Sequence, residues 1–392
     1  MRLPLEGIRI LDLSTMLPGP LCTQTLADFG ADVIKIEQPR GGDFFRSSKP
    51  FLKGDTSSLF MLVNRNKSSL TINLKSEKGR QLFYQLVKKA DVVVEQFRPG
   101  VVKKLKIDYD SLKAINPQII YCSISGYGQD GPYRLNAGHD INYLGYSGIL
   151  GVMGKKNEKP TIPSVQIADI GGGTFNSIIG ILLALIARTH SGVGQFVDIS
   201  MLDGAVGWLP YLASSYLATG NSPVAGDSML TGGYAAYQVY ETMDGKYLNI
   251  GAIEMHLWSN LCKFMGKPEF IPWQRVVEKQ KEMLAFFSEK FKSKTRDEWL
   301  EALSTIDTCA GPVNTVEEAF KDPQILHREM LFEVEHPRLG KIKQIGFPIK
   351  LSATPARFDR IAPDLGEDNA RIMSSLGYTR DQISEMEECG DI

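Results

Sequence analysis

The chain has 392 residues, of which 43% are hydrophobic and 23% charged; this length predicts two domains, or one with a large insertion, and the composition is that of a globular protein rather than a disordered or collagen-like one. The 44 Lys and Arg residues nearly balance the 45 Asp and Glu residues, so no global field favours nucleic acid or an anionic membrane. Five widely spaced cysteines indicate neither a zinc site nor a disulfide framework, and fit the reducing cytoplasm.

The first third of the chain alternates predicted strands and helices. Residues 8–13 and 33–37 predict strands, and between them the turn-like segment 17–20 leads into a helix that Gly30 stops. This is the size of a βαβ unit with parallel strands. Further strands at 70–74, 92–94 and 119–124, with a helix at 78–89, extend the same pattern. We therefore predict an α/β fold built on a parallel sheet.

A long apolar helix at 174–188 and a strand at 195–200 complete this first domain, which spans residues 1–208. The most apolar part of the helix, 178–187, is about half the roughly 20 residues that cross a bilayer, so a buried helix and no membrane contact are expected. The N-terminal residues lack the apolar core of a secretory signal, so we expect no export and a cytoplasmic location.

The rest of the chain predicts a smaller domain and a return to the first. Residues 209–226 have no strong periodicity and are expected to be a linker. Residues 227–325 predict a smaller α+β domain, with a hairpin of strands at 234–242 and 246–252 and helices at 256–265 and 279–290. Residues 326–392, with helices at 369–376 and 380–388, are expected to pack back on the first domain.

Two residues are candidates for acid–base chemistry. His139 follows a glycine at the start of a predicted helix, and histidine is the natural proton carrier near neutral pH. Asp169 precedes three glycines and the long helix, whose N-terminus offers free N–H groups to an oxyanion. Helix capping explains either residue equally well when each is taken alone.

Other polar residues have weaker signals. Glu254 follows a predicted strand, where it would cap the next helix or reach a cleft. Basic residues near strand ends could meet phosphates or simply face solvent; they are Arg40, Lys67, Lys75, Arg98 and Lys104. The chain has no Gly-x-Gly-x-x-Gly turn after its first strand, which makes Glu37 weak evidence for a dinucleotide, and it has no phosphate loop, nucleophile elbow or metal-ligand cluster.

Taken in order, the motifs resemble the family III CoA-transferases and, among them, the α-methylacyl-CoA racemases. The matching segments are LPGP at 17–20, LADFGADV at 26–33, FRPG at 97–100, SGYGQ at 125–129, GHDINY at 138–143, ADIGGG at 168–173 and GQFVD at 194–198. In transferases of the family, the aspartate that matches Asp169 is a nucleophile, and the position that matches His139 is usually not histidine. The racemases resemble this chain at His139, Asp169 and Glu254.

The resemblance implies a Rossmann-like large domain made from both chain ends, a smaller domain between them, and an interlocked homodimer. It implies that coenzyme A lies along the large domain and is the only cofactor-like group, as the coenzyme A moiety of the substrate. Ile72, Leu74 and Lys75 would flank its nucleotide end, Arg98 and Lys104 would meet phosphates, and Asp140 and Tyr143 would add contacts. Related enzymes often have arginine where this chain has Gln38, and Arg40 is expected to replace that contact.

The expected reaction is racemisation of a 2-methylacyl-CoA thioester through an enolate. His139 and Asp169 would face opposite sides of the α-carbon, Glu254 would orient His139, and the glycines after Asp169 would hold the enolate oxygen. One alternative is CoA transfer through an Asp169 anhydride and aspartyl-CoA thioester. A second alternative is a CoA-binding protein without catalysis.

Overall fold

The computed structural model describes residues 2–392 and divides the chain into two compact units. The first unit comprises residues 2–147, 165–208 and 324–392, and the second comprises residues 148–164 and 209–323. The division differs from the predicted boundaries in two places. Residues 148–164 group with the second unit, and the segment expected to be a linker contains helix α9 (Pro210–Thr219), whose side chains are not buried.

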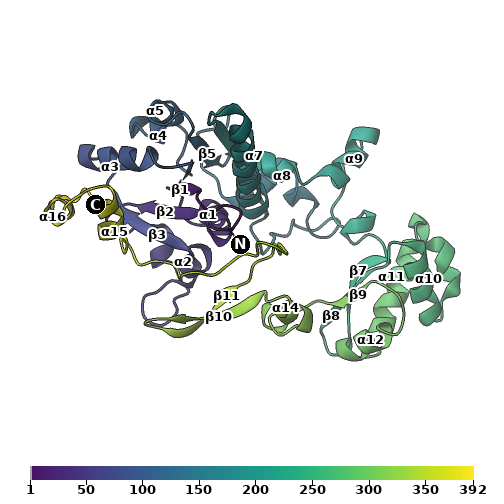
Figure 1. Ribbon diagram of the computed structural model, residues 1–392. Coiled ribbons are helices and arrows are strands. Elements are labelled where there is room, and N and C mark those ends of the chain that lie inside the picture. The colour runs from purple at the N-terminus through teal and green to yellow at the C-terminus, as the bar shows by residue number, and fades with distance from the viewer. Residues whose placement is uncertain (1) are drawn as a thin grey trace. The chain divides into compact units, whose positions relative to one another are not determined.

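The first unit is built on a six-stranded parallel sheet, which confirms the predicted α/β class (Figure 1). Its strands are β1 (Arg9–Asp12), β2 (Asp32–Glu37), β3 (Lys67–Thr71), β4 (Val92–Glu95), β5 (Ile120–Ser125) and β6 (Phe196–Ser200), in the order β3-β2-β1-β4-β5-β6. In the register, Leu11 of β1 lies between Ile34 of β2 and Val93 of β4.

Strand β3 begins three residues before the segment predicted from its apolar residues. The added residues, Lys67, Ser68 and Ser69, are polar but buried. The strand lies at the edge of the sheet, where it pairs with β2 on one side, and on the other the Ser69 N–H donates to Asp368 at 2.9 Å. Lys67 donates a hydrogen bond to Asp12, and Ser69 donates one to Glu37. These residues are buried because they are hydrogen-bonded, and not because they are apolar, so a prediction based on apolar residues missed them.

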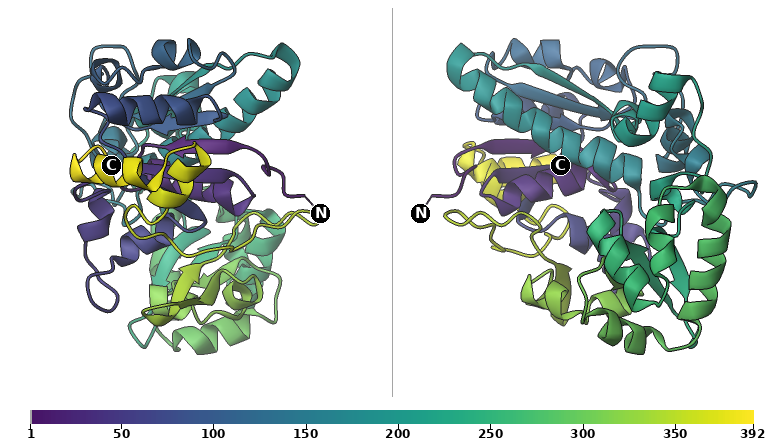
Figure 2. Two further views of the ribbon diagram at one scale, coloured as in Figure 1. Left: turned by 60° about the vertical axis from the view of Figure 1, so that its left-hand side comes forward. Right: turned by 90° about the vertical axis from the view of Figure 1, so that its right-hand side faces the viewer.

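Helices cover both faces of the sheet (Figure 2). Helices α3 (Glu77–Val87), α5 (Tyr109–Lys113), α15 (Asn369–Ser375) and α16 (Arg380–Glu388) share one core with alternate strand residues such as Leu11 and Val93. Helices α1 (Pro18–Asp28) and α7 (Asn176–Ser191) pack on each other and on β1, β2, β5 and β6. The C-terminal residues return to β3, where the Asn73 N–H donates to the Asp391 carbonyl.

The strand order places a crevice above β1 and β4. The chain runs from β1 outward to β2 and β3 in one direction, and from β4 to β5 and β6 in the other. The loops that follow β1 and β4 therefore diverge, and ligands of open α/β sheets bind at this switch point. The two loops contribute Met16, Leu17 and Gln96 to the cavity described below.

A single long helix spans Ile167–Ser191, so it begins seven residues before the predicted start at 174. Its first part, Ile167–Phe175, is π-helical and α7 continues it. By length and composition this helix could cross a membrane, although half of its most apolar window is buried against the rest of the chain. Core helices of soluble proteins pass the same test, and the helix packs on β5, β6 and α1.

The second unit has its own core. Strands β7 (Tyr237–Glu241), β8 (Tyr247–Gly251) and β9 (Ala310–Pro312) form an antiparallel sheet, and the first two are the predicted hairpin. Helices α10 (Met255–Phe264), α11 (Val277–Phe291) and α12 (Arg296–Leu303) bury Trp258, Phe287 and Phe291. The shorter elements of the chain are α2 (Ser58–Val63), α4 (Val101–Lys104), α6 (Asp140–Ser147), α8 (Met201–Val206), α13 (Val316–Ala319), α14 (Pro323–His327), β10 (Leu331–His336) and β11 (Gly340–Ile345).

Candidate active site

A cavity of about 730 Å³ opens at the switch point of the first unit. Three of the predicted site residues, His139, Tyr143 and Asp169, line it together. Most of the remaining wall is apolar. It includes Met16, Leu17, Leu21, Phe29, Phe45, Leu59, Leu62, Val63, Ile170, Phe175, Met330, Ile345, Phe347, Pro348 and Ile349.

Asp169 lies in the first turn of the π-helical segment and is held there by Asp140. One carboxylate oxygen of Asp140 accepts the N–H of Ala168 at 2.7 Å and the N–H of Asp169 at 3.0 Å. Asp140 also begins α6, the helix that follows His139. The carboxylate of Asp140 therefore fixes the spacing between the two candidate proton carriers, and the structure gives it this positioning role.

The carboxyl group of Asp169 has a raised pKa. Burial is the main cause, the negative charge of Asp140 adds to it and His139 opposes it, and together they raise the pKa of Asp169 to about 6. A carboxyl with a pKa of about 6 exchanges protons readily near neutral pH, whereas an ordinary aspartate is almost always ionised there. Asp169 is thus suited to both accept and return a proton.

His139 occupies the position before α6 without using its imidazole as a cap. Its main-chain N–H donates to the side chain of Asn142 at 3.0 Å, and its carbonyl accepts the N–H of Asn142 at 2.8 Å. The residue is exposed and contributes to the cavity wall. Both contacts with Asn142 use the main chain of His139, so its imidazole stays available to a ligand.

Gly138, which precedes His139, is required by the packing of Tyr143. A side chain at position 138 would place its Cβ 2.6 Å from the Tyr143 ring and 2.9 Å from the Tyr127 hydroxyl. Tyr143 is 4% exposed, and burial together with the nearby Asp169 raises the pKa of its hydroxyl well above the usual range. Tyr143 is therefore a neutral hydroxyl in the cavity wall.

The glycines after Asp169 do not form the expected oxyanion site. Because the helix begins at Ile167, these glycines lie inside it, and the Ala168 and Asp169 N–H groups already donate to Asp140. Gly171, Gly172 and Gly173 are buried. A Cβ at Gly172 would lie 2.6 Å from the Met201 carbonyl, so the glycines allow close packing on α8.

The other predicted coenzyme A contacts lie outside the described cavity wall, although they follow the carboxyl ends of β2, β3 and β4. Arg40, Lys75, Arg98 and Lys104 are exposed. Ile72 is 2% exposed and belongs to the core, with Leu74 packed against that core, so Ile72 can offer a ligand little beyond its main chain.

The two acidic residues Glu37 and Glu254 lie in different environments. Glu37 is buried and accepts two hydrogen bonds from Arg46, each 2.7 Å long, which leaves it no role at a ribose. Glu254 begins α10 in the second unit, its side chain makes no capping hydrogen bond, and it is exposed. Its predicted action on His139 remains a prediction.

Several cavity residues were not predicted, because no motif marks them. Gln96 follows β4 and accepts the Gly19 N–H at 3.2 Å. Arg65 lines the cavity with its guanidinium bonded to both oxygens of Asp28, at 3.0 and 2.7 Å. The nearest sequence signals were the position of Gln96 at a strand end and of Asp28 in a family motif. Among residues 2–392, no group of three His, Cys, Asp or Glu residues is placed to hold a metal.

Comparison with known proteins agrees with this geometry. The sequence profile of CoA-transferase family III matches residues 5–369. The chain belongs to this family. It is 34% identical to human succinyl-CoA:glutarate CoA-transferase, over 99% of this chain and 89% of that protein. It is 33% identical to human alpha-methylacyl-CoA racemase, over 97% of this chain and 96% of that protein.

Solved structures of the family have the same fold. A CAIB/BAIF family protein from Brucella suis superimposes with a TM-score of 0.84 and 36% identity, covering 96% of this chain and 100% of that one. The protein Rv3272 from Mycobacterium tuberculosis gives a TM-score of 0.80 and 30% identity, over 94% of this chain and 98% of that one. Family III thus contains both transferases and racemases, and this chain is about equally identical to members of each group. The geometry of the site must therefore distinguish the two reactions.

Proposed function

We propose that this family III protein racemises 2-methylacyl-CoA thioesters by moving the α-proton between the two faces of the α-carbon. The observation that carries this proposal is that His139 and Asp169 line one cavity, with the pKa of Asp169 raised to about 6. A transferase needs only the carboxylate, whereas proton transfer at both faces needs two groups that exchange protons near neutral pH.

In the proposed reaction, ionised Asp169 removes the α-proton from one face and becomes a neutral carboxyl. The C–H electron pair forms the enolate of the thioester. Protonated His139 then delivers its proton to the opposite face, which restores the thioester with inverted configuration. For the other isomer, neutral His139 is the base and neutral Asp169 is the acid. The reaction needs no cofactor beyond the coenzyme A moiety of the substrate, and Glu254 would orient His139.

The cavity supports an apolar acyl group. Its wall is mostly hydrophobic, and its one guanidinium, Arg65, is neutralised by Asp28 through two hydrogen bonds. The terminal carboxylate of a dicarboxylic acyl group would need an unpaired cation there, since burying a charge without a partner is costly. This favours a branched hydrocarbon chain over succinyl or glutaryl groups.

Coenzyme A would lie along the carboxyl edge of the sheet. Exposed Arg98, Lys104 and Lys75 would meet its phosphates, Arg40 would replace the contact that Gln38 lacks, and Ile72 and Leu74 would border the nucleotide. Affinity that rests on such exposed cations falls as ionic strength rises. Titrating coenzyme A at two salt concentrations, with Arg98→Ala for comparison, measures this contribution.

The second candidate function is CoA transfer with Asp169 as nucleophile. The human and Agrobacterium fabrum relatives named as succinate or glutarate CoA-transferases, 34% and 35% identical, favour it. In this reaction the Asp169 carboxylate attacks the thioester carbonyl and expels the thiolate of coenzyme A. The resulting anhydride is then attacked by that thiolate, which leaves an aspartyl-CoA thioester and a free acid.

One experiment separates the candidates. A 2-methylacyl-CoA is incubated in deuterated water without an acceptor acid, and the α-deuterium content and chirality are followed. Deuterium uptake with loss of chirality supports racemisation. Absence of exchange, combined with acyl exchange onto added carboxylates and trapping of Asp169 by hydroxylamine, supports transfer. Coenzyme A binding that survives Asp169→Ala, without either turnover, would identify a binding protein.

We also propose that the protein is a cytoplasmic homodimer. The long helix exposes Ile179, Leu183 and Ile186, which are 54, 61 and 58% exposed and lie at helical spacing on one stripe. Apolar stripes of this kind usually mark interfaces. Light scattering coupled to size exclusion should give twice the chain mass of 43.5 kDa; a monomer that partitions onto lipid vesicles would favour membrane contact instead.

A further inference from the structure

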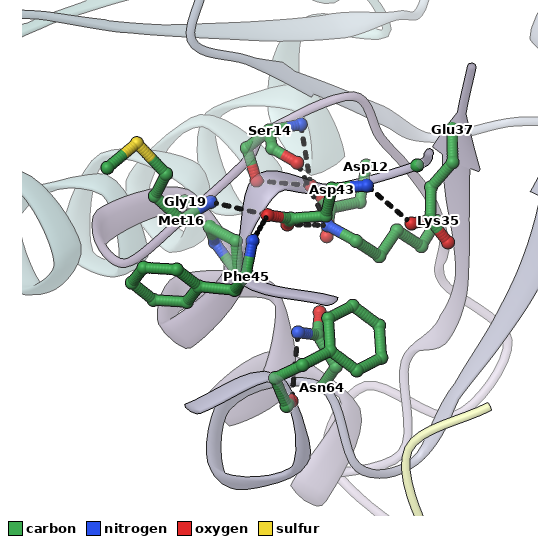
Figure 3. Close-up of polar contacts among 12 residues, drawn as sticks. Asp12, Ser14, Met16, Gly19, Lys35, Glu37, Asp43, Phe45 and Asn64 are labelled. Atoms are coloured by element: carbon green, nitrogen blue, oxygen red, sulfur yellow. Dashed lines mark hydrogen bonds and ion pairs between the residues drawn. The ribbon is translucent and has the colours of Figure 1, made fainter. Parts of the chain in front are cut away.

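A fully buried ion pair lies behind the wall of the cavity (Figure 3). The ammonium group of Lys35 is 2.8 Å from the Asp43 carboxylate, and both side chains are 0% exposed. Lys35 also donates to the Ser14 carbonyl at 2.9 Å. Lys35 comes from β2 and Ser14 from the loop after β1, so the pair ties that loop to the sheet at the switch point.

Asp43 carries the connection to the cavity. Its other carboxylate oxygen accepts the N–H of Met16 at 3.1 Å and the N–H of Phe45 at 2.9 Å. Both residues line the cavity, Met16 from the loop after β1 and Phe45 from the short 3-10 helix Phe44–Ser47, which Asp43 caps. A single carboxylate therefore sets the positions of two wall segments, as Figure 3 shows.

The Lys35–Asp43 pair and the backbone that it holds are expected to cost folding free energy, which argues against a purely structural role. Met16 has a φ of 65°, a left-handed conformation that side chains other than glycine rarely adopt. Buried ion pairs are also often no more stabilising than apolar residues of the same size. Backbone strain that the surroundings maintain is typical of functional sites. Here the strained residue is itself part of the cavity wall.

We propose that Asp43 is a positioning residue, which with Lys35 holds Met16 and Phe45 over the cavity and so sets its selectivity for long apolar acyl groups. The inference rests on the proposed binding of acyl-CoA. It assigns Asp43 and Lys35 no contact with the reacting atoms. It holds whether the chemistry is proton transfer or CoA transfer, because both reactions require the acyl group to fit the same wall.

The test compares two variants in which the charge of the pair has been removed. Asp43→Ala alone would take from the buried Lys35 the carboxylate 2.8 Å away and leave only the charges of Asp12 and Glu37 to act on it, so this protein is expected to be strongly destabilised. Lys35→Met/Asp43→Asn is neutral and keeps an oxygen for the Met16 and Phe45 N–H groups. Lys35→Met/Asp43→Ala is neutral and lacks it. The two proteins differ only in the acceptor at position 43.

The measurement is the ratio of dissociation constants for two thioether analogues of acyl-CoA, one with an acetyl-sized group and one with a long 2-methyl chain, by calorimetry. We expect the Asn variant to keep the parent preference for the long chain within about 3-fold, and the Ala variant to lose about 10-fold of it. Equal ratios in the two variants would overturn the inference. If the parent protein binds neither analogue, the proposed function has failed instead.

Asp91, at the amino ends of the strands of the same sheet, is a matched control. Asp91 accepts the Arg9 N–H at 2.8 Å and pairs with Arg188 at 2.7 Å, so its chemistry resembles that of Asp43. It precedes β4 at the amino end of the strand, away from the cavity loops. Asp91→Ala should lower the melting temperature and leave the ratio of dissociation constants unchanged. A shift of that ratio as large as in the Ala variant at position 43 would reduce the effect to general destabilisation.

Discussion

Replacing Asp140 by Asn should shift the pH dependence of catalysis while leaving the site assembled. The amide keeps an oxygen for the N–H groups of Ala168 and Asp169, which Asp140 accepts at 2.7 and 3.0 Å, and it removes the negative charge. That charge is the second cause of the raised pKa of Asp169, after burial. Without it, the pKa of Asp169 falls and the carboxylate stays ionised to lower pH.

The size of the shift is bounded by the structure. The pKa of Asp169 rises from 3.8 to about 6, about two units. Burial is the largest cause and remains in Asp140→Asn, so removing the charge can lower the pKa of Asp169 by only part of this rise. Because His139 and Asp169 exchange one proton, the acidic limb of the profile reports the first proton lost by the pair. We expect this limb near pH 6 in the parent and at a lower pH, still above 3.8, in Asp140→Asn.

The assay is kcat/KM for loss of chirality between pH 4.5 and 8.5, measured from each isomer. Both directions must give the same profile, because their ratio is the equilibrium constant, which does not depend on pH. Asp130→Asn, which removes an exposed carboxylate that does not contribute to the Asp169 shift, is the control. An acidic limb that stays in place in a folded Asp140→Asn protein would refute the assigned coupling.

Three other predictions follow from single contacts. His139→Gln should lower the rate of chirality loss from either isomer by about 10² to 10⁴-fold, because inversion needs both groups, with an unchanged melting temperature, since the residue is exposed; an undiminished rate would exclude it from the reaction. Gly204→Ala would place a Cβ 2.3 Å from the Gly172 Cα and should cost about 1–3 kcal/mol of stability. Gly145→Ala meets nothing within 4 Å and lies in α6, where alanine is favoured, so it should not lower the melting temperature. Equal melting temperatures of the two variants would contradict this. Burial would raise the pKa of Glu37, but Arg46 holds this pKa below its usual 4.5. The ionised Glu37 therefore contributes its full stabilisation above about pH 4.5, and this contribution is lost as the pH falls. Glu37→Gln should have a lower melting temperature than the parent at pH 7, and the difference between the two should become smaller towards pH 3.

The sequence predicted those elements whose apolar pattern survives in the fold. Strands β1, β2, β4 and β5 are buried along almost their whole length, and their runs of Val, Ile and Leu are typical of strands covered on both faces. Strand β3 was misplaced because Lys67 and Ser69 are buried with polar partners on other strands. Pairing across a sheet is set by tertiary structure, which a local pattern does not contain.

The same reasoning explains what could be predicted of the site. His139 and Asp169 were chosen for their chemistry and their family motifs, and the structure brings them to one cavity. The glycines beside Asp169 were misinterpreted, because a local pattern does not distinguish a helix that starts at the glycines from one that starts at Ile167. Whether a glycine serves an oxyanion or close packing depends on what lies opposite, and here α8 lies there.

Asp140 illustrates how far residue chemistry alone can lead. From the sequence it was one of several polar groups expected to meet coenzyme A. In the fold one of its carboxylate oxygens accepts the main-chain N–H of Asp169, while its charge raises the pKa of the same residue. Hydrogen bonding fixes where Asp169 lies and electrostatics fixes when it carries a proton, so one side chain couples position to protonation. A carboxylate that only bound substrate would alter KM, whereas one with this coupling must also move the pH profile.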